Sequence, residues 1–525
     1  MKVPPRDRDG SVTEVSRLTD RLSALDTSFL YMEEPTTAMH VGNVSVFQAP
    51  PEGFDYDRLI ALIRERIAYV PRFRQRVRSV PGHLGNPVWV DDEAFDLGYH
   101  VRRSALPRPG TDEQLRELVA RVQSRRLDRH RPLWEMYLVE GLSGQRFAII
   151  SKTHHALVDG VSALDLSQVI LDTDPEEHDR PPDVWRPARE PSTIELVAGA
   201  VGDALLHPRG ALETVRSGVL DVRSSIGRVA GLAGGLAGGV LALARAAASS
   251  APVSPLNAEI GEARRYATVD LSLDDFRAVR AAHGGSVNDV VLAVVSGALR
   301  AWLQTRGEAV AGHTNVRALV PVSVRTETHS GALGNRVASY LVDLPVGEPS
   351  PVMRLHQVSY RMKAHKDTGQ AVGARGLVGL AGFAPPTLHA AGARVASSLS
   401  RRWFNLVVTN VPGPQQPLYA GSARMLAAYP VIPLAKGQAV SIALTSYDGG
   451  VYFGLNGDRD AMPDLAVLAQ CLRDSLAELL DTSRPRQPAR RSVSAAAASR
   501  GRAKPSTSKA NGAASRTSAK GRTRA

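Results

Sequence analysis

The feature that most constrains the fold of this chain is an apolar run that ends in two consecutive histidines. Residues 147–150 (Phe-Ala-Ile-Ile) have the length and character of a buried strand, and residues 162–170 place apolar side chains at helical spacing. His154 and His155 therefore stand where a strand ends and the chain turns toward the next element. A rigid scaffold commonly presents catalytic side chains from strand ends and the loops after them.

The residue types in this turn are suited to proton transfer. A neutral imidazole is well matched to proton abstraction near neutral pH, which makes His155 the candidate general base. Asp159 follows four positions later and can orient the site, and Gly160 removes the Cβ penalty where the backbone changes direction. Strand alternation points His154 to the opposite face, where it packs or hydrogen-bonds locally in a supporting role. A histidine pair at a strand end can also be purely structural, and the pair by itself does not decide between the two.

The complete heptapeptide carries a family resemblance. Residues 154–160 (His-His-Ala-Leu-Val-Asp-Gly) match the HHxxxDG motif of CoA-dependent acyltransferases and of condensation domains in peptide synthetases. Over residues 20–480 the chain resembles the bacterial wax ester synthase/diacylglycerol acyltransferase family, because further motifs follow in the family's order. These motifs are Pro132-Leu133-Trp134, Ser286-Val287-Asn288-Asp289, Gly334-Asn335-Arg336-Val337 and Asn410-Val411-Pro412-Gly413-Pro414.

The resemblance implies an α/β fold of two domains, like chloramphenicol acetyltransferase, each a mixed sheet flanked by helices. With the composition, it predicts five parts. They are a disordered N-terminus (1–20), an N-terminal acyltransferase domain with the histidine motif (21–190), an Ala/Gly-rich helical linker (191–262), a C-terminal acyltransferase domain (263–482) and a disordered basic tail (483–525).

Two stretches have both a structural and a functional interpretation. Asn288 and Asp289 are expected to shape the substrate site between the domains, yet Ser286 with Asp289 also has an N-cap pattern that is a sufficient structural reason for both. Trp134 is expected to pack beneath the histidine strand. The basic residues 71–77 are interpreted as solvated surface, with contact to CoA phosphates as the alternative.

The resemblance also implies an activity. The family transfers a long-chain acyl group from acyl-CoA to diacylglycerol, forming triacylglycerol, or to fatty alcohols, forming wax esters. By that resemblance His155 is the base and Asp159 holds the motif's geometry through an arginine pair. Acyl-CoA is a substrate, and neither a metal nor a bound organic cofactor is expected. The sequence has no G-x-S-x-G elbow, Walker A motif or Cys/His cluster, which argues against a serine esterase, a nucleotidase or a zinc enzyme.

Two alternatives remain open. A condensation-type acyltransferase acting on carrier-protein thioesters shares the HHxxxDG motif, although no carrier or adenylation module is present. A non-catalytic lipid- or nucleic-acid-binding protein on the same scaffold would explain the basic tail, but the intact heptapeptide weighs against it.

Composition constrains the compartment. The single cysteine, Cys471, excludes an intramolecular disulfide, and its place in a helical leucine pattern predicts a buried, inert thiol. Residues 1–7 are polar and lack the apolar core of a signal peptide, so we expect a cytoplasmic protein.

Positive charge is concentrated at one end. Residues 483–525 hold twelve Lys or Arg and no acidic residue, which equals the whole net charge of +12. Such a tail binds polyanions, and because it has no aromatic side chain for base stacking we expect no specific nucleic acid. The linker's longest uncharged run, between Arg228 and Arg245, is too short and Gly-rich to span a bilayer. Peripheral association with the inner face of the plasma membrane or with lipid inclusions is the expectation, with a solubilising tail and a plain helical linker as alternatives.

Overall fold

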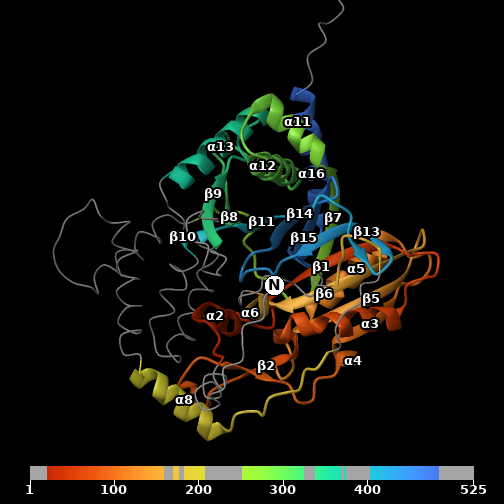
Figure 1. Ribbon diagram of the computed structural model, residues 1–525. Coiled ribbons are helices and arrows are strands. Elements are labelled where there is room, and N and C mark those ends of the chain that lie inside the picture. Colours follow the sequence, from red (N-terminus) through yellow and green to blue (C-terminus); the bar gives the residue numbers. More distant parts are fainter. Residues whose placement is uncertain are drawn as a thin grey trace, which may run out of the picture. The chain divides into compact units, whose positions relative to one another are not determined.

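The computed structural model describes residues 20–158, 170–176, 183–206, 251–323, 337–367, 372–373 and 403–483 (Figure 1). All of them belong to one compact unit that ends at Ser483. Several sequence predictions lie outside the described residues. These are Asp159, Gly160, the Gly334-Asn335-Arg336 turn, the N-terminus to residue 19, linker residues 207–250 and the tail from residue 484.

The first sheet holds the histidine strand at its centre. Its order is β12-β13-β1-β6-β5-β4, and it is mixed because β4 runs parallel to β5 while the other neighbours are antiparallel. β1 and β6 pair along their whole length, from His40 opposite His154 to Gln48 opposite Arg146. The strands of this sheet are β1 (His40–Gln48), β4 (Val101–Ala105), β5 (Trp134–Leu142), β6 (Arg146–His154), β12 (Tyr419–Ala420) and β13 (Ala423–Val431).

Both faces of this sheet are covered. On one face α5 (Asp112–Ser124) places Leu115 and Val119 against Ile150 of β6, and it begins with a capping box formed by Thr111 and Gln114. Phe147 and Ile149 point to the other face, because strand side chains alternate. Trp134 is buried there beside the histidine strand, as predicted.

The first half of the chain contains further described elements. The helices are α2 (Ala24–Met32), α3 (Tyr56–Arg66), α4 (Leu97–His100), α6 (His155–Val158) and α8 (Thr193–Leu206), and the short 3-10 turns are η1 (Ile67–Tyr69), η2 (Pro71–Arg74) and η3 (Pro81–His83). β2 (Gln75–Arg78) and β3 (Val88–Asp91) form a separate two-stranded sheet.

The second sheet is larger and also mixed. Its order is β10-β9-β8-β11-β14-β15-β7, with β11 parallel to both β8 and β14. A hairpin at Asp448-Gly449-Gly450 joins β14 to β15. The strands are β7 (Arg264–Ser272), β8 (Val316–Ser323), β9 (Val337–Leu344), β10 (Val372–Gly373), β11 (Leu406–Pro412), β14 (Val440–Tyr447) and β15 (Gly450–Asp458).

In the described part of the chain, four helices cover the second sheet, and Figure 1 shows them gathered together in green and blue. They are α11 (Leu273–His283), α12 (Val287–Thr305), α13 (Pro351–Asp367) and α16 (Leu465–Ser483). α12 is apolar on nearly every side, from Val290 to Leu299, so it is stable only when surrounded by the sheet and the other helices. Cys471 of α16 is buried in the same core, as predicted. Mixed sheets flanked by helices are therefore confirmed.

Among the described residues, no single helix has both the length and the apolar composition of a membrane span. Of the helices that the structure describes, α11 and α12 reach that length and composition when taken together, and they are bent by 99° at the break between them.

The two halves of the sequence do not each build one sheet. Residues 423–431 lie within the predicted C-terminal domain of 263–482, yet β13 pairs with β1 of the first sheet. β13 thus lies beside β15, and an added Cβ at Gly454 would stand 1.9 Å from the Pro430 carbonyl oxygen. Because β13 joins the first sheet, the two sheets are not divided at the sequence boundary predicted between the two domains.

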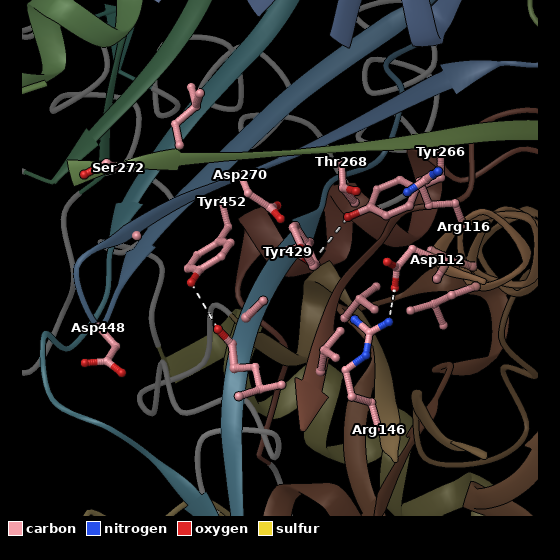
Figure 2. Close-up of a pocket in the computed structure, with 18 of the residues that line it drawn as sticks. Asp112, Arg116, Arg146, Tyr266, Thr268, Asp270, Ser272, Tyr429, Asp448 and Tyr452 are labelled. Atoms are coloured by element: carbon pink, nitrogen blue, oxygen red, sulfur yellow. Dashed lines mark hydrogen bonds and ion pairs between the residues drawn. The ribbon is translucent and has the colours of Figure 1, made fainter. Parts of the chain in front are cut away.

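A cavity of about 680 Å³ lies at this junction, lined by residues of α5, β1, β7, β13 and β15 (Figure 2). Three tyrosines dominate it. The Tyr452 hydroxyl donates to the Leu426 carbonyl at 3.0 Å. The Tyr266 hydroxyl donates to the Pro430 carbonyl at 3.2 Å, next to Tyr429. The tyrosines therefore join strands from both sheets.

The basic stretch 71–77 is neutralised by acidic residues from elsewhere. Arg74 pairs with Asp183, and Arg76 pairs with Glu190 at 2.7 Å. The guanidinium of Arg72 lies 2.6 Å from the Asp20 carboxylate. The stretch therefore anchors neighbouring segments instead of presenting free positive charge.

Candidate active site

The histidine pair lies where β6 ends and α6 begins. Because β6 is central, both backbones are held by neighbouring segments: the N–H of His154 donates to the Leu133 carbonyl at 2.9 Å, and that of His155 to the Met39 carbonyl at 2.8 Å. β6 therefore ends and α6 begins between His154 and His155, and the main chain of both residues is held by hydrogen bonds.

His154 is fully buried and neutral. Its Nδ1 accepts a hydrogen bond from the Ala156 N–H at 3.1 Å, which leaves the proton on Nε2. Burial, followed by the charges of Arg129 and His155, lowers the pKa of His154 to about 3. A ring held in one tautomer and removed from solvent supports the turn, and the catalytic supporting role of His154 stays a prediction.

His155 keeps part of its surface exposed. It is the first residue of α6, so it leaves the sheet by the change to helix and not by the strand alternation that the sequence suggests. Its ring stacks on Phe29 of α2, with centroids 4.3 Å apart and an interplanar angle of 18°. Figure 1 shows α2 beside α6. This contact fixes the ring plane of the candidate base.

Glu33 and Arg129 are site residues that the sequence analysis missed. The Glu33 side chain is 1% exposed, with Oε1 3.9 Å from His154 Nε2. Its Oε2 accepts from Arg129 Nε at 2.7 Å. The sequence carries no signal for this triad, because its contacts join three separate segments.

Polar side chains continue along the face of β6 that bears His154. Lys152 is fully buried, and its Nζ donates to the carbonyls of Val122, at 3.1 Å, and Arg125 at the end of α5. Those carbonyls carry the negative end of the helix dipole, which suits an ammonium group. Burial lowers the pKa of Lys152 to about 8.

His40 of β1 stands opposite His154 and is also buried. Its Nε2 lies 2.9 Å from the carbonyl oxygen of Gln123. Burial, followed by the charge of Lys152, holds the pKa of His40 well below its usual value. His40 therefore has a packing role in the strand.

Asn288 and Asp289 lie at the N-terminus of α12, against the second sheet. Asp289 Oδ2 accepts the Ser286 N–H at 2.8 Å and the Ser359 hydroxyl at 2.8 Å, which completes the predicted cap and ties α13 to α12. Asn288 Oδ1 accepts from Asn410 Nδ2 of β11 at 3.1 Å. These contacts join two of the family-like motifs, and a substrate role for Asn288 and Asp289 stays a prediction.

The cavity of Figure 2, lined by Tyr266, Tyr429 and Tyr452, is separate from the histidine pair. A second, open pocket of about 500 Å³ lies beside the histidines, because Glu33 and Arg129 line it. In the described part of the chain, no group of three or more His, Cys, Asp or Glu side chains could hold a metal ion.

Comparisons with known proteins agree with this geometry. Residues 22–291 match the model of the wax ester synthase/diacylglycerol acyltransferase catalytic domain, and residues 333–480 match that family's C-terminal domain. A Mycobacterium tuberculosis H37Rv protein described as a probable diacylglycerol O-acyltransferase, tgs2, is 36% identical over 472 residues, which cover 88% of this chain and 98% of the relative.

Solved structures give the same result. The wax ester synthase/diacylglycerol acyltransferase of Marinobacter aquaeolei VT8 is 31% identical, with a TM-score of 0.63 over 88% of this chain and 99% of that chain. The first condensation domain of the calcium-dependent antibiotic synthetase, 16% identical with a TM-score of 0.53 over 89% of this chain and 97% of that chain, shares the fold. Two matched domain models, a relative along nearly its whole length and a shared fold show that the chain belongs to the wax ester synthase/diacylglycerol acyltransferase family.

Proposed function

We propose that this protein transfers a long-chain acyl group from acyl-CoA to the free hydroxyl of diacylglycerol, forming triacylglycerol. The observation that supports the proposal is the difference between the environments of the two histidines. His154 is buried and neutral, while His155 is partly exposed at the start of α6 with its ring held by Phe29. A positioned imidazole with access to substrate is what hydroxyl activation requires.

The reaction is a direct transfer. The acceptor hydroxyl oxygen attacks the thioester carbonyl carbon while His155 takes the hydroxyl proton. The tetrahedral intermediate collapses, the C–S bond breaks, and protonated His155 gives its proton to the CoA thiolate. The products are the new ester and free CoA thiol, and no step requires a metal or a bound cofactor.

The acceptor is proposed from two lines of support. The mycobacterial relative carries the name of a diacylglycerol acyltransferase, which favours diacylglycerol. The Marinobacter structure carries the name of a wax ester synthase as well, which supports fatty alcohols as second acceptors.

We also place the protein in the cytoplasm, attached peripherally to the inner face of the plasma membrane or to lipid inclusions. Both proposed acceptors are poorly soluble and reside in lipid phases. The twelve basic residues of 483–525 supply the attraction to anionic lipid.

The test is acyl transfer from radiolabelled palmitoyl-CoA to dioleoylglycerol or hexadecanol by wild type, His155→Ala and the exposed control His313→Ala. Label should appear in triacylglycerol with wild type and control, and kcat should fall about 10²–10⁴-fold in His155→Ala, the usual contribution of a general base. Circular dichroism and Tm confirm folding of each variant.

Other outcomes change the conclusion. Product only with hexadecanol would change the acceptor and keep the mechanism. Undiminished turnover in His155→Ala would refute its role as base. Turnover only with acyl-carrier-protein thioesters would assign the condensation-type activity.

A further inference from the structure

The pocket beside the histidines is rich in arginine. Its volume is about 500 Å³, and its lining includes the side chains of Arg102, Arg125, Arg126 and Arg129. It is formed by the segment between α5 and β5, together with the start of β4 and the C-terminal end of α2. Four guanidinium groups at one concave site indicate an anionic ligand.

Two of these arginines are already compensated. Arg129 pairs with Glu33, and Arg102 Nη2 lies 3.1 Å from the Glu135 carboxylate. The third acid of the pocket, Asp128, accepts the His130 N–H at 2.9 Å and lies 3.9 Å from Arg131 Nε. The acidic side chains of the pocket are therefore each held by a positive or N–H group.

Arg125 and Arg126 carry the uncompensated charge. Both are exposed, and neither has an acidic partner within ion-pair distance among the described residues. The backbone beneath them is nevertheless fixed, because buried Lys152 donates to the Arg125 carbonyl. Within the described part of the chain, Arg125 and Arg126 thus line the pocket without an acidic partner, while its other charged side chains are paired.

Helix α2 connects this pocket to the catalytic histidine. Phe29 stacks on His155, and Glu33 at the end of the same helix lines the pocket. Four residues of helix correspond to about 6 Å along the axis. A ligand held in the pocket is therefore anchored a short distance from the reacting centre.

We propose that Arg125 and Arg126 bind the phosphate groups of the CoA nucleotide, so that this pocket is the anchor for the acyl donor. The inference rests on the proposed function, in which acyl-CoA is the donor. The nucleotide end of CoA is a compact polyanion, and guanidinium forks match phosphate oxygens in pairs. The concave shape of the site favours a discrete phosphate ligand over a flat anionic surface, and the three carboxylates of its lining are each held by their own partners.

The test compares two donors that differ only in the nucleotide. Palmitoyl-CoA and S-palmitoyl-pantetheine are assayed with wild type, Arg125→Ala/Arg126→Ala, the charge-retaining Arg125→Lys/Arg126→Lys and the control Arg121→Ala, an exposed arginine of α5 outside the pocket. The double alanine variant should raise the KM for palmitoyl-CoA about tenfold with kcat unchanged. KM for the pantetheine donor should stay the same, the lysine variant should recover part of the loss, and the control should match wild type.

Direct binding keeps this test separate from the proposed function. Calorimetry with adenosine 3′,5′-bisphosphate should show binding to wild type and about tenfold weaker binding to the double alanine variant. Absence of acyl transfer by wild type would refute the proposed function, while nucleotide binding would still support the pocket.

Three results would overturn the pocket assignment. The first is an equal KM change for both donors, and the second is unchanged nucleotide binding in the double variant. The third is loss of binding to phosphatidylglycerol vesicles with KM unchanged, which would assign the arginines to a lipid surface.

Discussion

Glu33 Oε1 lies 3.9 Å from His154 Nε2, and both side chains are 1% exposed. The separation is too long for a hydrogen bond, so the carboxylate acts on the imidazole through its field. Since His154 Nδ1 accepts from Ala156, the Nε2 proton faces Glu33. A buried carboxylate thus favours the tautomer that supports the turn before His155, and Arg129 offsets its charge.

Removing Arg129 should therefore destabilise the protein. In Arg129→Met the Glu33 carboxylate stays buried without its partner, which costs about 3 kcal/mol, the lower end for a buried pair because Arg129 is 41% exposed. Urea unfolding measures the loss. The double variant Glu33→Gln/Arg129→Met should recover a large part of it, and strictly additive losses would contradict the coupling.

Lys152 should make stability rise with pH in the alkaline range. Its folded pKa of about 8 lies below the ordinary 10.5, so between these values the unfolded state binds more protons. Between these pH values the free energy of unfolding rises by up to about 1.4 kcal/mol per pH unit. Below pH 8 Lys152 is charged in both states, so its contribution to the free energy of unfolding does not change with pH.

The measurement is unfolding free energy of wild type and Lys152→Met from pH 7 to 10. Tyrosine titrations are common to both proteins and cancel in the difference. The stability of wild type relative to the variant should increase above pH 8, and a constant difference would show that Lys152 does not titrate there.

Gly42 should not tolerate a side chain. It lies on β1 opposite Lys152, and an added Cβ would stand 2.6 Å from the Ser151 carbonyl oxygen and 2.4 Å from Gln123 Nε2. Gly42→Ala should cost about 1–3 kcal/mol through overpacking. Gly312→Ala is the matched control, because nothing lies within 4 Å of the position that an added Cβ would take there. Equal Tm values for the two variants would contradict the close approach.

Asp289 should matter for stability more than for substrate binding. Its carboxylate caps α12 and accepts the Ser359 hydroxyl, so Asp289→Ala should cost about 1–2 kcal/mol. KM for both substrates should stay near wild type once folding is verified by Tm. A raised KM with unchanged Tm would instead place Asp289 in the substrate site, and Asn288→Ala measured in parallel tests its neighbour.

Local patterns in the sequence predicted much of this protein. Residues 147–150 lie in β6 with the histidines at its end, and Ser286 caps a helix. Cys471 is buried in its leucine-rich helix. These predictions succeed because strand alternation, helical spacing and capping act between residues a few positions apart. The motif order further identified the family, which the comparisons confirm.

Only the tertiary structure decided the surroundings of those motifs. Arg129 and Glu33 are 96 residues apart in sequence, and β13 joins a sheet whose partner strand β1 lies nearly 400 residues earlier. No periodic pattern encodes such pairings, because they depend on which buried faces and charges meet once the chain is compact. The same reason explains why the pairing of residues 71–77 and the pocket lined by Arg125 and Arg126 appear only in the folded protein.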